Sequence, residues 1–438
     1  MSDARQRHDP YAALRQRGFL IFSGGRLCSG MAATLLNAAL FWQVYDITGS
    51  KWQLGMIGLV RFVPSLGLSL LAGAIADRYD RKRLALLSQA VQFLAVLAIT
   101  AVTLRGSENL LLIYGGVFVF ALASTFEWPA RSALLPLVVT KETFANAIVV
   151  SGTFQQLAFV TGPALGGVLI AVSGVGLAYG VLTGLLGVSI VLLMLVRPRR
   201  DDGPKRAVSL AGIREGIAFV RGRQVILGAM TLDMFAVIFG GATALLPIYA
   251  RDILDVGSVG YGLLLGAIDG GAFLMSIALI FVRPAVRPGR TLLFAVLAFG
   301  LATIVFGLSR SFPLSLLACL LIGMSDEVSV VMRQTTIQLA TPDELRGRVT
   351  SVNMLFIGAS NQLGAVESGF VAALTTATFA VVSGGIGCLA VLGIVAAAMP
   401  ELRRYRVGQP GGHLPGAPPP PGAPGGPGEP VEGVAPAR

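Results

Sequence analysis

Long runs of apolar residues without any charge alternate with short polar segments along most of the chain. Residues 27–45, 84–104 and 291–309 contain no Asp, Glu, Lys or Arg. A helix needs about 20 residues of this kind to cross the hydrocarbon core of a bilayer. The pattern therefore predicts helices that span a membrane.

The longest uncharged run, residues 143–196, is too long for a single crossing. As one helix it would extend about 80 Å, more than twice the thickness of the hydrocarbon core. The Ser-Gly-Val-Gly segment at 173–176 is typical of a turn, so we predict two spans here. The complete set of predicted spans is 19–47, 52–77, 83–104, 109–131, 144–172, 176–196, 225–250, 258–282, 290–309, 312–340, 346–374 and 378–400.

These spans predict an all-α membrane protein with twelve transmembrane helices in two six-helix bundles. We expect bundles at 1–196 and 225–406, joined by a polar cytoplasmic connector at 197–224. Residues 407–438 are rich in Pro and Gly, and we expect them to form a disordered cytoplasmic tail. The connector carries apolar residues at helical spacing, so we expect an amphipathic helix on the membrane surface. These apolar residues are Leu210, Ile213, Ile217 and Val220.

An internal repeat supports the division into two bundles. Residues 202 positions apart match at Arg131 and Arg333, Glu142 and Glu344, Phe154 and Phe356, Gly162 and Gly364, and Gly167 and Gly369. Six predicted helices separate the partners. Because six is an even number, the two repeats would run parallel to each other.

The composition also favours a membrane protein. Hydrophobic residues make up 54% of the sequence and charged residues only 13%, whereas soluble domains carry about 25% charged residues. The net charge of +11 would suggest a nucleic acid partner in a soluble protein. Basic residues gather on the cytoplasmic side of membrane proteins, however, so we expect no nucleic acid partner.

Lys and Arg residues are concentrated in alternate loops. If the N-terminus is cytoplasmic, the outer loops contain only Lys51, Arg105, Arg251 and Arg310. This asymmetry predicts that both termini are cytoplasmic, as in a multi-pass protein of the bacterial inner membrane.

The sequence offers little chemistry for catalysis or for holding a cofactor. Cys28, Cys319 and Cys388 lie in apolar stretches without C-x-x-C spacing. His8 and His413 lie in polar terminal segments, and no ATP-binding G-x-x-x-x-G-K-[ST] motif is present. We therefore expect no metal, no cofactor and no enzymatic activity.

The loop between the second and third predicted spans has a glycine, three residues, Asp-Arg and then a basic cluster. It contains Gly73, Asp77, Arg78, Arg81 and Lys82. This pattern resembles the signature loop of the major facilitator superfamily. The second half keeps a reduced copy at Arg283, Arg287, Gly289 and Arg290.

A closer resemblance is to the branch of that superfamily that contains the enterobactin exporter and related drug exporters. The segments that carry it are 48–55, 71–82, 338–348 and 401–404. The likeness extends from about residue 12 to 406. It implies a proton-coupled exporter, with substrates that range across the branch from siderophores to macrolides.

In that superfamily the signature loop implies an inner latch that holds the outward-open state. Asp77 would face the N-terminal end of the eleventh span near Arg346, where the helix dipole favours a negative charge. Arg81 would pair with Glu127 at the end of the fourth span. The latch would then comprise Gly73, Asp77, Arg78, Arg81, Lys82 and Glu127. Alternatively, the basic residues only determine topology.

Ionisable residues inside the spans are costly and usually mark a transport pathway. Those present are Arg26, Arg61, Asp233, Asp269, Asp326, Glu327 and Glu367. A proton carrier would be one of the acids, because burial favours the neutral form of a carboxyl group. The alternative for each residue is a structural ion pair between helices.

The resemblance implies that spans one, four, seven and ten line a central cavity. The cavity candidates would then be Arg26, Asp233, Asp326 and Glu327. Asp269 could pair with Asp233 or with Arg61, and Glu367 could reach the outer interface. Small polar residues within the spans could hydrogen-bond a substrate, although we expect most of them to hold helices together. These residues are Asn37, Gln43, Gln155, Gln156, Asn353, Asn361 and Gln362.

These features favour a secondary exporter that works by alternating access. A proton would enter from outside to an acid of the second half, and an amphipathic drug, siderophore or other natural product would leave from the cavity. A lysophospholipid flippase or an uptake transporter of the same fold are the alternatives, and a membrane enzyme or receptor is a remote one. We expect a monomer whose partners are a small-molecule substrate, protons and membrane lipid.

Overall fold

The computed structural model describes residues 12–106, 109–140, 142–199, 210–282 and 285–406, and every regular element within them is a helix. The first half contains α1 (Arg17–Thr48), α2 (Lys51–Arg78), α3 (Arg81–Leu104), α4 (Leu110–Val138) and α5 (Phe144–Leu195). The second half contains α6 (Leu210–Arg221), α7 (Gln224–Phe239), η1 (Ala242–Leu245), α8 (Leu246–Ile248), η2 (Tyr249–Ile253), α9 (Gly257–Phe281), α10 (Pro288–Leu308), α11 (Phe312–Ala340), α12 (Asp343–Leu374), α13 (Ala377–Ala398) and α14 (Pro400–Arg404).

The element α5 consists of two membrane-crossing helices joined by a tight turn. Ser173 and Gly174 have non-helical backbone angles, and Gly174 has a φ of 74°. Glycine adopts such an angle without steric cost, which explains its place in the turn. The prediction that two spans meet at this segment is confirmed.

The seventh span is assembled from α7, η1, α8 and η2, which form one apolar segment from Gln224 to Ile253. Its helix is interrupted after Gly240. A Cβ atom at Gly241 would lie 2.4 Å from the backbone oxygen of Gly364 on α12. The interruption therefore occurs where only a glycine allows the two backbones to approach this closely.

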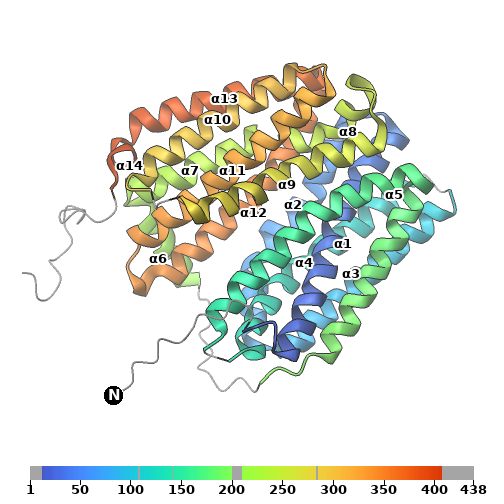
Figure 1. Ribbon diagram of the computed structural model, residues 1–438, viewed down its shortest axis with the longest axis horizontal. Coiled ribbons are helices and arrows are strands. Elements are labelled where there is room, and N and C mark those ends of the chain that lie inside the picture. Colours follow the sequence, from blue (N-terminus) through green and yellow to red (C-terminus); the bar gives the residue numbers. More distant parts are fainter. Residues whose placement is uncertain (1–11, 107–108, 141, 200–209, 283–284, 407–438) are drawn as a thin grey trace, which may run out of the picture.

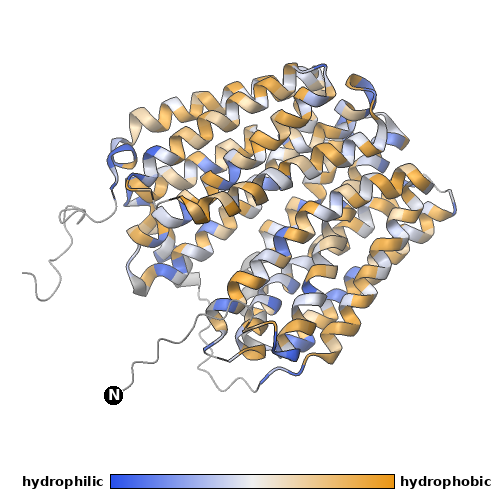
Figure 2. Ribbon diagram, viewed as in Figure 1, coloured by the Kyte–Doolittle hydropathy of each residue, from blue (hydrophilic) through white to orange (hydrophobic). Residues whose placement is uncertain are grey.

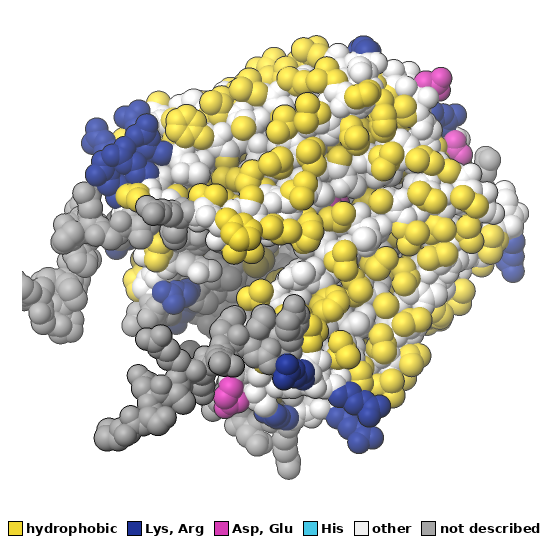
Figure 3. All heavy atoms as spheres, in the orientation of Figure 1, with side chains coloured by type: hydrophobic (Ala, Val, Ile, Leu, Met, Phe, Trp, Pro, Cys, Tyr) yellow, Lys and Arg dark blue, Asp and Glu magenta, His cyan; other side chains and the backbone are white. Residues whose placement is uncertain are grey.

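The described residues thus form twelve long helices, as predicted. Nine segments of the described residues, with the divided α5 counted once, are long and apolar enough to cross a membrane. The helices α2 and α12 complete the set of long helices, and they pack against each other. Figure 2 and Figure 3 show hydrophobic residues over the sides of the molecule. Large apolar side chains such as Leu111 and Ile280 are 79% and 77% exposed. Such a surface is suited to contact with lipid.

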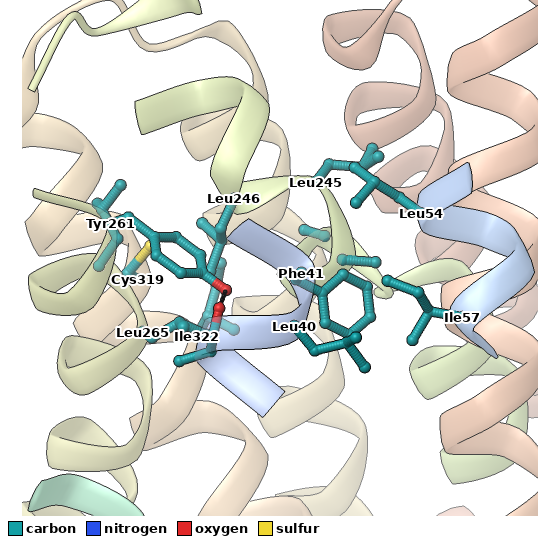
Figure 4. Packing of buried hydrophobic residues seen from close by; sticks show 14 of the residues in the cluster. Leu40, Phe41, Leu54, Ile57, Leu245, Leu246, Tyr261, Leu265, Cys319 and Ile322 are labelled. Atoms are coloured by element: carbon teal, nitrogen blue, oxygen red, sulfur yellow. Dashed lines mark hydrogen bonds between the residues drawn. The ribbon is translucent and has the colours of Figure 1, made fainter. Parts of the chain in front are cut away.

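The helices form two bundles that lie side by side (Figure 1). The helices α1 to α5 pack together in one bundle, and the helices from α7 to α13 form the other. Most contact between the bundles is made by α2 with α12 and by α5 with α9. A continuous cluster of buried apolar residues joins them, and Figure 4 shows Leu40 and Phe41 of α1 in the same cluster as Leu245, Leu246 and Tyr261.

The packing follows the internal repeat. A Cβ atom at Gly162 would lie 3.1 Å from the backbone oxygen of Met31 on α1. At the equivalent position, a Cβ atom at Gly364 would lie 2.7 Å from the backbone oxygen of Val237 on α7. The two repeats therefore use the same glycine to bring equivalent helices together.

The connector helix α6 differs from the expectation that its apolar face lies on the membrane surface. Val220 is buried, and Ile217 packs with it against apolar residues of α7, α11 and α12. Glu215 also forms an ion pair with Arg348 of α12. The described face of α6 is thus turned toward the protein. The side chains of Leu210 and Ile213 lie outside the described part of the structure.

Candidate functional site

A cavity of about 660 Å³ lies between the two bundles, near the middle of their helices. The N-terminal bundle contributes α1, α2, α4 and α5 to its wall, and the C-terminal bundle contributes η1, α9 and α12. Phe120, Phe159 and Leu265 provide apolar surface. The polar lining residues are Thr34, Asn37, Arg61, Ser65, Ser124, Thr125, Thr243, Asp269, Asn361 and Gln362. A mixed lining in a cavity of this size is suited to an amphipathic small molecule.

Two opposite charges face this cavity from opposite bundles. Arg61 comes from α2 and Asp269 from α9. Arg61 donates a hydrogen bond from Nη1 to Oδ1 of Asn37 at 2.6 Å. Within the described residues no ion pair joins Arg61 to Asp269, although both line the same cavity. A ligand between the bundles could therefore meet both charges.

Close packing of α2 on α12 places Arg61 at the cavity wall. A Cβ atom at Gly58 would lie 2.9 Å from the backbone oxygen of Gln362. The absence of a side chain at Gly58 lets the two helices touch one turn away from Arg61. Gln362 therefore lies on the same wall as Arg61.

The cavity is closed on one side by contacts between the bundles, which we term the distal contact layer. Trp52 of α2 stacks on Phe370 of α12 with ring centroids 4.2 Å apart. Arg251 of η2 forms an ion pair with Asp46 of α1 at 3.0 Å. The hydroxyl of Tyr45 donates a hydrogen bond to Asp252. Glycines make the backbones touch as well, at Gly55 with Gly369 and at Gly167 with Gly262.

The bundles diverge at the opposite end of the molecule. The two ends of the described chain lie at this end, together with α6 and α14 (Figure 1). The distal contact layer, in contrast, includes residues at the end of α1 and at the start of α2, away from this end of the molecule. The arrangement thus combines a closed side with a side on which the bundles separate.

A second charged cluster lies inside the C-terminal bundle. Arg333 of α11 is only 2% exposed and forms an ion pair with Asp233 of α7, with 3.1 Å between Nε and Oδ1. It also donates a hydrogen bond from Nη1 to Asn353 at 2.9 Å. Asp326 and Ser329 line a small space beside Asp233. The cluster ties α7, α11 and α12 together within one bundle.

A related cluster lies inside the N-terminal bundle. Arg131 of α4 is 5% exposed and pairs with Glu127 at 2.7 Å. Glu127 also accepts hydrogen bonds from Gln89 at 3.1 Å and from Gln92 at 3.3 Å. Neither Arg131 nor Arg333 was among the ionisable residues expected to mark a transport pathway. The only signal that singled out these two arginines was their match in the internal repeat.

The four residues expected to line the central cavity are not on its wall. Arg26 donates from Nε to Oε1 of Gln155 at 3.1 Å, on the α1–α5 contact. Asp233 forms its ion pair with Arg333, and Asp326 lines the small space next to Asp233. Glu327 is the residue after Asp326 on α11. Neither pairing suggested for Asp269 is an ion pair in the described structure. The cavity lining instead includes Arg61 and Asp269. Glu367 is not among the lining residues, and its carboxyl group accepts a hydrogen bond from the neighbouring Ser368.

The signature loop joins the last turn of α2 to the first turn of α3. Gly73, Asp77 and Arg78 belong to the helical end of α2, but their side chains lie outside the described part of the structure. Asp80 caps α3 by accepting a hydrogen bond from the amide of Arg83 at 2.7 Å. This cap orients the first turn of α3, which carries the basic residues.

The basic residues of the loop contact the ends of neighbouring helices. Arg81 donates to the backbone oxygen of Ala133 on α4 at 3.2 Å, and Lys82 donates to that of Met194 on α5 at 2.8 Å. The expected pair of Arg81 with Glu127 is therefore not the one observed, because Glu127 pairs with Arg131 of its own helix. A cation at a helix C-terminus is favoured by the helix dipole, which accounts for the position of Lys82.

No group of three or more His, Cys, Asp or Glu side chains among the described residues is placed to hold a metal ion.

Residues 8–408 match the sequence profile of a protein family described as transmembrane secretion effector. The chain is also similar to the enterobactin exporter EntS of Escherichia coli. The two are 27% identical over 388 residues, which cover 88% of this chain and 92% of the exporter.

Solved structures of transporters share the fold. An inward-facing bacterial homologue of the human lysosomal transporter Spinster superposes with a TM-score of 0.68 at 14% identity, covering 89% of this chain and 96% of that one. The nucleoside transporter NupG superposes with a TM-score of 0.70 at 10% identity, covering 87% and 99%. At these identities the likeness establishes the arrangement of the helices alone.

Proposed function

The chain belongs to the transmembrane secretion effector family of major facilitator transporters, and from that premise we propose that it exports an amphipathic small molecule by proton-coupled alternating access. As a secondary transporter of this superfamily it is a multi-pass membrane protein and not an enzyme. Its substrate, the direction of transport and the coupling to protons form the proposal.

The observation that carries the proposal is the central cavity with one charge from each bundle. Arg61 and Asp269 lie on opposite walls, and apolar and uncharged polar side chains fill the surface between them. An amphipathic molecule with one ionised group would bury its apolar part and satisfy its polar part in such a site. Its binding would join the two bundles, which is what a transporter that moves them against each other requires.

The arrangement of the bundles supports loading from the side on which they diverge. The distal contact layer closes the other side through the Trp52–Phe370 stack and the Arg251–Asp46 ion pair. We infer from the distribution of Lys and Arg that the divergent side is cytoplasmic, since both ends of the described chain lie on it. Substrate would thus enter from the cytoplasm, and the distal contact layer would part to release it outside.

We assign the proton to Asp269. This carboxyl lies in the cavity and has no cation within ion-pair distance in the described structure, in contrast to Asp233, which is paired with Arg333. A proton that binds Asp269 from outside would change the charge of the cavity and so favour release of the substrate. The available energy is about 2.3 kcal/mol per charge for each 100 mV of membrane potential, together with any pH gradient.

The similarity to the enterobactin exporter supports export of a siderophore, drug or related natural product. The latch at the signature loop would control the return of the bundles. Arg81 and Lys82 bind α3 to the ends of α4 and α5, and Asp77 would link this group to α12 in the outward-open state. In this proposal Gly73 allows close packing next to the signature loop, and Arg78 adds a positive charge to it.

Efflux from cells tests the proposal. Cells that produce the protein are loaded with a fluorescent drug or with a catecholate siderophore, and its loss is followed with and without a protonophore. We expect faster loss than in cells without the protein, and we expect the protonophore to abolish the difference. Export that persists after the proton gradient collapses would refute proton coupling, and faster accumulation in place of loss would identify an uptake transporter.

A further inference from the structure

Five arginines from two separate elements converge on one small surface pocket. Arg287 is the N-cap residue of α10 and Arg290 lies in its first turn, whereas Arg403 and Arg404 end α14 and Arg406 follows that helix. Together they line a pocket of about 510 Å³, formed by Arg287, Arg290, Arg403, Arg404 and Arg406. Figure 3 shows Lys and Arg gathered at the end of the molecule where α14 lies. In the described part of the chain none of the five forms an ion pair with Asp or Glu.

A tight joint between α10 and α14 holds these arginines together. A Cβ atom at Gly289 would lie 1.9 Å from the backbone oxygen of Leu402, so α14 lies directly on the first turn of α10. The side chain of Leu402 is 1% exposed and packs toward Gly228 of α7. Like charges brought this close repel each other. The joint therefore maintains a concentration of positive charge that an anion would relieve.

The pocket lies at the head of an apolar stripe. From Arg290 the exposed face of α10 continues at helical spacing through Phe294, which is 62% exposed, and Leu301, which is 49% exposed. In a membrane this stripe faces the acyl chains, and the arginines lie at the level of the headgroups. The N-terminal end of α10 borders the pocket through Arg287 and Arg290, and a helix N-terminus favours an anion near it.

We propose that this arginine pocket binds the phosphate group of an anionic phospholipid, with the lipid's acyl chains along the stripe of α10. Guanidinium groups bind phosphate oxygens through paired hydrogen bonds, which suits arginine more than lysine for such a site. Free inorganic phosphate would use the same chemistry, but it would gain nothing from the apolar stripe. The lipid would fix α14 and α10 at the membrane surface, independently of what the central cavity carries.

Lipid binding to the purified full chain tests the proposal. The protein in detergent is titrated with phosphatidylglycerol or with phosphatidylcholine, and bound lipids are counted by native mass spectrometry. We expect a preference for phosphatidylglycerol that the variant R290Q/R404Q weakens by roughly 10- to 30-fold, since each arginine near an anionic headgroup contributes about 1 kcal/mol. The variant R197Q/R199Q removes two exposed arginines from the end of the α5 segment and should keep the preference.

A second variant changes the joint and keeps every charge. We expect Gly289→Val to separate α14 from α10 and to lose the preference, while the protein still elutes as a folded species in size-exclusion chromatography. Equal binding of both lipids by the unmodified protein would overturn the proposal, as would equal losses in R290Q/R404Q and R197Q/R199Q. Displacement of phosphatidylglycerol by equimolar inorganic phosphate would identify a site for free phosphate instead.

Discussion

Arg131 and Arg333 occupy equivalent positions of the internal repeat, and each is buried against a carboxylate. The partners differ in origin. Glu127 comes from the same helix as Arg131, whereas Asp233 comes from a different helix than Arg333. The first pair is therefore local, and the second holds two helices of the C-terminal bundle together. Removing one partner of the second pair should have the larger effect on the bundle.

We predict that Asp233→Asn lowers the free energy of unfolding by about 3–5 kcal/mol, because it leaves the buried guanidinium of Arg333 without its counter-ion. Unfolding in detergent with increasing denaturant, followed by circular dichroism, measures the change. The matched control is Asp255→Asn, since Asp255 is exposed and has a φ of 52°, an angle that asparagine tolerates. Equal stability of the two variants would contradict a structural role for the Asp233–Arg333 pair.

The sequence pattern predicted the twelve helices because each apolar run must satisfy its own backbone hydrogen bonds in lipid. It predicted the turn near Ser173 for the same reason, since no single helix of that length fits a bilayer. The ends were less well determined. The fourth span was placed at 109–131, but α4 continues to Val138. Arg131 was therefore expected at the cytoplasmic boundary of the span, although it is buried inside the bundle.

The cavity lining could not be predicted from spacing. Which face of a helix points inward depends on its rotation within the bundle, and rotation is set by packing partners far away in the sequence. Arg26 and Asp233 were expected in the cavity, but their helices turn these side chains toward Gln155 and Arg333. Conversely, Asn37 and Gln362 were expected either to bind substrate or to join helices, and the structure places both on the cavity wall.

We predict that Gly58→Val shifts the protein toward the outward-open state. The added side chain would collide with the backbone of α12 at Gln362, so the distal contact layer could not close. The measurement is alkylation of a single cysteine at Ser65, on the cavity wall, by a membrane-impermeant reagent added from outside. The control is Gly67→Val in the same helix, because a Cβ atom at Gly67 has no other atom within 4 Å. Unchanged labelling in Gly58→Val would contradict the role of this contact.

We predict that Asp269→Asn uncouples export from the proton gradient. The amide cannot take up and release a proton, so the variant should export at a low rate that no longer rises when the external pH falls. Asp269→Glu keeps a titratable group and should retain the dependence on external pH. Counterflow of labelled substrate, which needs no gradient, should persist in both variants. A normal pH response of Asp269→Asn would assign the proton to another acid, such as Asp326.

We predict that Asp77→Asn slows net export while leaving the protein in the membrane at its normal level. In the outward-open state Asp77 would face the N-terminal end of α12, and its charge would contribute about 1–2 kcal/mol to that state. This corresponds to roughly a 5- to 30-fold change in the balance of the two states. Substrate binding should persist, because Asp77 lies at the end of α2, far along the helix from Arg61. Asp255→Asn provides the control, since it removes one carboxylate from an exposed position at the other end of the molecule. Export by Asp77→Asn at the unmodified rate would leave the signature loop with a role in topology only, because the positive charges of Arg81 and Lys82 would remain in place without a latch.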